Sequence, residues 1–211
     1  YLEKALHLGP ADGEIQAAIS ALEQRPVESD PLRKGWLTSL GEESPLGMAL
    51  SENRLLITTE SGLVQALDRA SGMGLWQVRL PPLTSGPATE GGLVITGGQD
   101  GTLTALNAVD GSFLWRFPTG GPVYAAAALD GEQVFCASSD GTLYALNTRD
   151  GTLRWKYKTG GALHASPLAA GGAVYFGSKD TRIYSLDART GEPRWQYGFA
   201  TRGPVESRPV L

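Results

Sequence analysis

The chain has 211 residues, of which 41 % are hydrophobic, and it carries a formal net charge of −4. The lack of a basic run argues against nucleic acid or an anionic membrane as a ligand, and the longest apolar stretches, such as Val123–Leu129, are too short to span a bilayer. The single cysteine, Cys136, excludes an internal disulfide and is expected to be a buried thiol, because it lies in an apolar segment.

Residues 1–24 are predicted to form two antiparallel helices. Their apolar residues recur at the spacing of one helical face: Leu2, Ala5, Leu6, Leu8, Ile15, Ala18, Ile19 and Leu22. Pro10 ends the first helix, and Asp12 offers an N-cap for the second. Residues 1–10 resemble the second helix of a tetratricopeptide repeat, although an ordinary amphipathic hairpin explains the same pattern. Residues 25–35, with two prolines among charged residues, are predicted to be a linker.

The rest of the chain repeats with a period of about 40 residues. The period is set by five tryptophans: Trp36, Trp76, Trp115, Trp155 and Trp195. Four of them follow a glycine by four residues, these being Gly72, Gly111, Gly151 and Gly191. A hydrophobic segment that ends in Leu-Asp or Leu-Asn precedes each of these glycines. A repeat of this length is read before any local pattern, because it determines how the whole domain is built.

Each repeat is predicted to contain four β-strands. The second and third strands are joined by two-residue turns such as Asp100-Gly101 and Asp140-Gly141, in which glycine accepts the positive φ of a tight hairpin. The third strand ends in the Leu-Asx pair, and the fourth contains the tryptophan. Four strands in 40 residues indicate an all-β fold, namely a β-propeller of four-stranded blades over residues 36–211. No stretch has room for the crossover helices of a parallel α/β sheet.

The repeat resembles that of quinoprotein-type β-propellers. Residues 140–155 read Asp-Gly-Thr-Leu-Tyr-Ala-Leu-Asn-Thr-Arg-Asp-Gly-Thr-Leu-Arg-Trp, and near-copies end at Trp76, Trp115 and Trp195. The Gly-His and Trp-Asp pairs of WD-type blades are absent from the repeating positions. The resemblance implies that each tryptophan packs between blades against a turn glycine of the adjacent blade. It assigns blade docking to Trp76, Trp115, Trp155, Trp195, Gly111, Gly151 and Gly191.

Some positions depart from the repeat. Only about four complete blades fit in the chain, whereas propellers of this family usually have seven or eight. We expect the native polypeptide to continue past Leu211, with Trp36 supplying the outer strand of the last blade and residues 205–211 beginning a further inner strand. A dimer of two half-rings is the alternative way to cover the apolar blade faces. Thr181 replaces a turn glycine, and its turn is therefore expected to differ from the others.

No catalytic or metal-binding constellation is found. Enzymes of the resembling family bind pyrroloquinoline quinone and calcium at the propeller axis, commonly beside a disulfide of adjacent cysteines, which one cysteine cannot form. Two histidines, His7 and His164, make a histidine-based zinc site improbable. The acidic residues of the tight turns are explained by turn chemistry: Asp100, Asp140 and Asp180. We therefore predict no catalytic residue and no metal, with pyrroloquinoline quinone as the alternative cofactor.

The innermost strand of each blade is expected to line a central channel. Alignment of the repeats places four residues at one mouth of this channel: Thr84, Tyr124, His164 and Glu206. These residues differ from blade to blade while the framework repeats, which makes them candidates for recognition. A merely solvated rim is the alternative interpretation of the same four positions.

These observations predict a non-catalytic binding or scaffolding module with protein partners. By resemblance, its functional analogue is the propeller lipoprotein that scaffolds the insertion of outer-membrane β-barrels, which implies a bacterial cell envelope or periplasm. The alternatives are a pyrroloquinoline-quinone-binding sensor domain of a signalling protein and a fragment of a quinoprotein dehydrogenase. The missing cysteine pair argues against the dehydrogenase but not against the sensor.

Overall fold

The structure is a computed structural model in which the chain divides into two units, Tyr1–Leu37 and Thr38–Leu211. It describes residues 36, 39–40, 43–195 and 198–207. The helical hairpin predicted for residues 1–24 and the linker predicted for residues 25–35 lie outside the described residues.

Four antiparallel sheets of four strands each make up the described part of this unit, and we call them blades 1 to 4. Blade 1 consists of β1 (Pro45–Ser51), β2 (Arg54–Thr59), β3 (Leu63–Asp68) and β4 (Gly74–Arg79). Blade 2 consists of β5 (Ala88–Glu90), β6 (Leu93–Gly97), β7 (Thr102–Asn107) and β8 (Phe113–Pro118). Blade 3 consists of β9 (Ala128–Asp130), β10 (Gln133–Ala137), β11 (Thr142–Asn147) and β12 (Leu153–Lys158). Blade 4 consists of β13 (Leu168–Ala170), β14 (Ala173–Ser178), β15 (Arg182–Asp187) and β16 (Phe199–Ala200).

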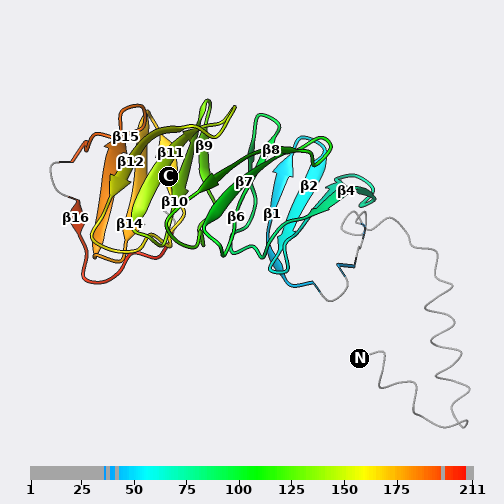
Figure 1. Cartoon of the computed structure of the whole chain (residues 1–211), viewed down its shortest axis with the longest axis horizontal. Helices are drawn as coiled ribbons and strands as arrows, with labels where there is room; N and C mark the ends of the chain where they lie inside the picture. The colour runs from blue at the N-terminus through cyan, green and yellow to red at the C-terminus, as the bar shows by residue number, and fades with distance from the viewer. Residues whose placement is uncertain (1–35, 37–38, 41–42, 196–197, 208–211) are drawn as a thin grey trace, which may run out of the picture. The chain divides into compact units, whose positions relative to one another are not determined.

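Within each blade the strands pair in chain order, and the blades follow one another side by side (Figure 1). The prediction of an all-β fold built from four-stranded propeller blades is therefore confirmed. Three details differ from the prediction at the edges. Trp36 is not part of a strand, and neither are residues 205–207. In blade 4 the outer strand β16 begins after Trp195 and not at it.

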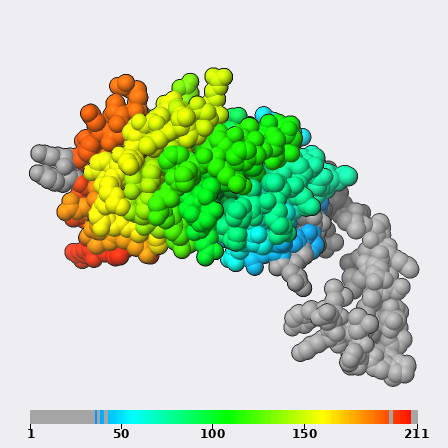
Figure 2. All heavy atoms as spheres, viewed as in Figure 1, coloured from blue at the N-terminus to red at the C-terminus, as the bar shows by residue number. Residues whose placement is uncertain are grey.

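The hydrophobic core lies between the blades and not within one sheet. Strand β10 shows why, because all five of its residues are buried and neighbouring side chains point to opposite faces of the sheet. Val134 and Cys136 join the cluster shared with blade 2, whereas Phe135 and Ala137 join the cluster shared with blade 4. A third cluster joins blades 1 and 2. Figure 2 shows the resulting close contact of successive blades.

The first strands of the blades, β1, β5, β9 and β13, lie next to one another. They line an open pocket of about 300 Å³ whose wall is rich in alanine: Ala49, Ala88, Ala126, Ala127, Ala128 and Ala169. These small side chains let neighbouring blades approach closely on their inner side. Three of the predicted channel-mouth residues, Thr84, Tyr124 and His164, lie four residues before β5, β9 and β13.

The turn at Thr181 was expected to differ from its counterparts, and that expectation is wrong. Thr181 has φ +67°, close to the +82° of Gly141 at the same position of blade 3. The backbone N–H and the hydroxyl of Thr201 both donate to the Thr181 carbonyl, at 2.8 and 2.9 Å. Thr159 makes the same pair of hydrogen bonds to Gly141. These contacts hold the turn in a conformation that threonine alone disfavours.

Candidate protein-binding surface

Three tryptophans pack against a glycine turn of the next blade. A Cβ atom added to Gly111 would lie 2.6 Å from Cε3 of Trp76, and Gly151 and Gly191 stand in the same relation to Trp115 and Trp155. Each indole N–H also donates to a carbonyl beyond its own blade, at 3.1, 2.8 and 3.0 Å respectively. Glycine is required at these positions for two reasons. The backbone of the turn has a positive φ, and the indole ring leaves no room for a side chain.

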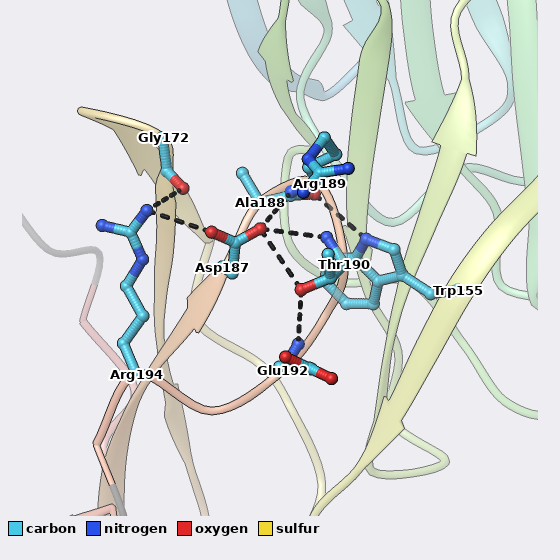
Figure 3. A network of polar contacts seen from close by, with 8 residues as sticks. All are labelled: Trp155, Gly172, Asp187, Ala188, Arg189, Thr190, Glu192 and Arg194. Carbon is cyan, nitrogen blue, oxygen red and sulfur yellow. Dashed lines mark hydrogen bonds and ion pairs between the residues drawn. The ribbon is translucent and has the colours of Figure 1, made fainter.

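The turn that receives Trp155 is shaped by Asp187 (Figure 3). The backbone N–H groups of Arg189 and Thr190 both donate to the Asp187 carboxylate at 3.0 Å, and Arg194 pairs with it at 3.2 Å. The hydrogen bond from the Thr190 backbone and the one from Arg194 hold the pKa of Asp187 below its usual value. The Leu-Asx pair of the repeat therefore fixes the turn, and the turn presents its glycine and the carbonyl of Ala188 to Trp155.

Trp195 departs from the other three, which corrects the prediction that all four lie between blades. Its side chain is 42 % exposed, whereas Trp115 is 5 % exposed. The Trp195 ring contacts Tyr175 of its own blade, with centroids 6.0 Å apart. The physical reason is that none of the described residues forms a further blade that could cover this ring.

Two of the three aspartates of the tight turns, Asp140 and Asp180, also join blades, a role that the interpretation as turn chemistry missed. The Asp140 carboxylate accepts the backbone N–H of Thr142 at 2.7 Å, which is the expected turn contact. It also accepts the Tyr144 hydroxyl at 2.5 Å and the backbone N–H of Gly120, on the segment that leaves blade 2, at 2.8 Å. Asp180 makes the same contacts with Tyr184 and Gly160, and we call this arrangement the Asp–Tyr clasp.

The clasp perturbs the acidity of both partners. Burial by itself would raise the pKa of Asp140, but hydrogen bonds from Tyr144, Thr142 and Gly120 outweigh it and hold the pKa below its usual value. Burial and the neighbouring Asp140 carboxylate raise the pKa of Tyr144. The hydrogen bond therefore favours the charged form of the aspartate and the neutral form of the tyrosine. A charge-assisted hydrogen bond of this kind is stronger than a neutral one.

Three of the predicted channel-mouth residues lie in the segments that connect one blade to the next, and the fourth follows β16. We call these four residues the mouth row: Thr84, Tyr124, His164 and Glu206. The Thr84 hydroxyl donates to the Val123 carbonyl at 2.8 Å, next to Tyr124. The rings of Tyr124 and His164 meet edge to face with centroids 4.9 Å apart. The structure thus places members of the row from consecutive blades beside one another.

Lys179 extends the mouth row, and the sequence analysis missed it. Its Nζ lies 3.1 Å from Oε1 of Glu206, and its backbone N–H donates to the Ala162 carbonyl at 3.0 Å. Burial lowers the pKa of His164, the charge of Lys179 lowers it further, and Glu206 partly opposes both. His164 is therefore held neutral near pH 7, beside one positive and one negative group.

A second group was also missed, at the other end of the row. An open pocket of about 440 Å³ lies beside Tyr124, and its wall includes Glu60 and Gln99. Glu60, Gln99 and Lys179 all stand one residue before the turn residue of their blade. The pattern that predicted the mouth row applies to these three residues as well. They occupy a position that varies between blades while the neighbouring positions repeat.

The described residues contain no group of three or more His, Cys, Asp or Glu side chains able to hold a metal ion. Cys136 is fully buried on β10, and burial raises the pKa of its thiol, which makes it a poor nucleophile. No helix among these residues has the length and apolarity needed to cross a membrane. The mouth row and Lys179 bring aromatic, neutral polar and charged groups together, with Tyr124 exposed.

Comparison with known families agrees with this framework. The family model described as outer membrane protein assembly factor BamB matches residues 33–210. The chain belongs to this family. The match covers all four blades, so the propeller repeat of the BamB family accounts for the described unit.

Individual relatives are distant and longer than this chain. BamB of Nitrosomonas eutropha is 31 % identical over 120 residues, which make up 56 % of this chain and 26 % of that protein. The crystal structure of BamB from Moraxella catarrhalis has a TM-score of 0.65 and 29 % identity, over 71 % of this chain and 47 % of that one. Quinoprotein ethanol dehydrogenase of Pseudomonas putida is 43 % identical over 61 residues, 28 % of this chain and 10 % of that protein. The chain thus spans about a quarter of the BamB relative and a tenth of the dehydrogenase.

Proposed function

We propose that this chain forms a non-catalytic, protein-binding part of a scaffolding propeller and that the mouth row is its recognition surface. The observation that carries the proposal is that repeated and non-repeated residues have different roles. Those that repeat from blade to blade hold the blades together, through the tryptophans and their glycines. Those that do not repeat gather at one end, where Tyr124 meets His164 and Lys179 meets Glu206.

The chemistry of the mouth row suits a protein partner. Tyr124 is 47 % exposed, and an exposed tyrosine on a rigid support offers a large contact area at a small cost in conformational entropy. A Lys–Glu pair and a neutral histidine beside it provide a polar rim with donors and acceptors. The relatives named as outer membrane protein assembly factors suggest the class of partner, a protein engaged in outer-membrane assembly.

Site-specific photocrosslinking tests the proposal. A benzoylphenylalanine introduced at Tyr124 is expected to capture a discrete protein from cell-envelope extracts. The matched control carries the same residue at Phe113 on β8, which is 55 % exposed and stands away from the mouth row. Capture at position 124 and not at 113 supports the proposal, whereas equal capture at both positions or none at either contradicts it.

A quinone-binding sensor is the second candidate function, and the similarity to a quinoprotein ethanol dehydrogenase is the observation that favours it. Titration of the purified chain with pyrroloquinoline quinone and calcium separates the two candidates. The scaffold proposal expects no stoichiometric binding. Stoichiometric binding without turnover of alcohols or sugars would favour the sensor, and binding with turnover would favour the dehydrogenase.

A further inference from the structure

The open pocket of about 440 Å³ beside Tyr124 combines apolar, aromatic and acidic side chains in one wall. We call it the mouth pocket. Blades 1 and 2 and the segment that leads into blade 3 all contribute to it, through Leu46, Glu60, Leu83, Thr84, Gln99 and Tyr124. Its volume lies within the range of about 300–1,000 Å³ in which proteins bind small ligands, so it has room for one side chain of a partner.

Glu60 gives the mouth pocket a negative charge. Its side chain lines the pocket, and within the described part of the chain no hydrogen bond or ion pair reaches its carboxylate. Arg79 donates to the residue that follows Glu60, but its guanidinium is paired with Glu43 at 3.0 Å. At the other end of the mouth row, Lys179 is paired with Glu206 at 3.1 Å. The charge that is left over at the pocket is therefore negative, which favours a cationic ligand.

Tyr124 adds an aromatic ring to the same wall. The ring is 47 % exposed, and its edge-to-face contact with His164 restricts it, so that less conformational entropy is lost when a ligand binds. A cation over the face of such a ring is attracted by the quadrupole of the ring. Leu46 and Leu83 supply apolar surface for the methylene groups of a long cationic side chain. The pocket therefore suits both parts of a basic side chain, its apolar stem and its charged head.

We propose that the mouth pocket binds an arginine side chain of the partner protein, with the guanidinium against the Tyr124 ring and paired with Glu60. Arginine fits better than lysine, because its planar guanidinium stacks on aromatic faces and donates in its own plane to a carboxylate. The side-chain carbonyl of Gln99, in the same wall, offers a further acceptor. The inference rests on the proposed function only in taking the arginine from a protein, and it is tested with a small probe so that the two can fail separately.

The probe is N-acetyl-argininamide, followed through the amide resonances of the isotope-labelled full chain. N-acetyl-citrullinamide, which has the same length and no charge, is its matched control. Saturable shifts are expected at Glu60, Gln99 and Tyr124, with the arginine probe binding about fivefold more tightly than the citrulline probe. Glu60→Gln should abolish that preference. Asp130→Asn, which removes the charge of an exposed residue at the end of β9, should leave it intact.

A second pair of variants tests the aromatic part of the pocket. Tyr124→Leu should weaken binding of the arginine probe by about threefold, and Tyr124→Phe should weaken it less, because phenylalanine keeps the aromatic face. Equal losses in these two variants, no saturable shifts, shifts that map elsewhere, equal affinity of the two probes, or a preference that survives Glu60→Gln would each overturn the assignment.

The crosslinking experiment at position 124 separates this inference from the proposed function. Capture of a protein there without binding of the arginine probe would overturn the inference and leave the proposed function standing. Binding of the arginine probe without capture of any protein would contradict the proposed function and support the preference of the pocket for arginine.

Discussion

The interface between blades 1 and 2 and the interface between blades 3 and 4 share one device and differ in another. Both have a tryptophan seated on a glycine turn, Trp76 on Gly111 and Trp155 on Gly191. Only the second has an Asp–Tyr clasp, in which Asp180 joins Gly160 to Tyr184. The Trp–Gly contact is therefore the constant part of blade docking, and the clasp is an addition that individual blades can lose.

Blade 1 shows a different arrangement at the same turn. Ser61 stands where the other blades have aspartate, and a carboxylate is supplied by Glu43, which accepts hydrogen bonds from Ser61, Thr59 and Arg79. The hydrogen bonds from Ser61 and Arg79 lower the pKa of Glu43. The comparison shows that a carboxylate accepts hydrogen bonds at this turn in each blade. The residue that supplies the carboxylate varies, and so does the hydrogen bond to the preceding blade.

Loss of the Trp–Gly contact should have the largest effect on the free energy of unfolding. Trp115→Ala is expected to lower the free energy of unfolding by about 3–5 kcal/mol, because a buried aromatic ring leaves a cavity between two blades. Urea denaturation followed by circular dichroism measures the change. Trp195→Ala is the matched control and should cost less than about 1 kcal/mol, since that ring is half in solvent. Equal costs for the two substitutions would contradict the assigned roles.

Substitution of the glycine in the Trp–Gly contact should have the second-largest effect on stability. Gly151→Ala should cost more than about 2 kcal/mol, because the added Cβ meets the Trp115 ring at 2.6 Å and the backbone has φ +70°. Gly131→Ala has a similar φ of +58° but meets nothing within 4 Å, so it should cost about 1 kcal/mol. Thermal unfolding of both variants separates the strain of the backbone from the clash with the ring. Similar losses in the two would mean that the ring is not the constraint.

The clasp should contribute less than the tryptophan. Tyr144→Phe removes the hydroxyl that donates to Asp140 and is expected to lower the free energy of unfolding by about 1–2 kcal/mol at neutral pH. Tyr124→Phe, at an exposed ring, serves as the control and should change it little.

The clasp also predicts a dependence on pH. The folded state lowers the pKa of Asp140, so this stabilisation is present above the pKa of the unfolded state and is lost as the pH falls through the folded value. Tyr144→Phe should therefore flatten the loss of stability in acid, below about pH 4. A variant with the same acid profile as the parent would exclude the hydrogen bond as a source of the shift.

The smallest expected effect is a gain. Thr181→Gly should raise the free energy of unfolding by about 0.5–1 kcal/mol, because Thr181 occupies a positive φ that glycine adopts without strain. Thr142→Gly, one residue beyond the corresponding glycine of blade 3, should destabilise instead, since it lies in β11. A loss of stability on Thr181→Gly would mean that the threonine side chain matters more than the strain.

Much of the fold could be predicted from the sequence because the repeat fixes it. The strands, the tight turns and the Trp–Gly pairs recur at one spacing, so each blade supports the assignment of the others. Thr181 could not be predicted, since hydrogen bonds from Thr201 override the local preference of its backbone. The exposure of Trp195 depends on what packs over its blade, which no local pattern encodes.

The candidate site was only partly predictable. Thr84, Tyr124, His164 and Glu206 could be aligned through their repeat positions, but Lys179 lies 15 residues after His164 and joins the row only through folding. The Asp–Tyr clasp is absent from blade 2, where Thr104 stands at the position of Tyr144 and Tyr184. The sequence alone did not reveal the clasp, because it depends on contacts that only the folded blades 3 and 4 show.

We propose that stability and recognition depend on different residues of this propeller, and one paired measurement tests this proposal most directly. Partner capture by benzoylphenylalanine at Glu206 and the free energy of unfolding are measured for the double variant Tyr124→Ala/His164→Ala. We predict that capture is lost while the free energy of unfolding stays within about 1 kcal/mol of the parent, because both side chains lie partly in solvent. Retained capture, or loss of capture only together with unfolding, would contradict the claim.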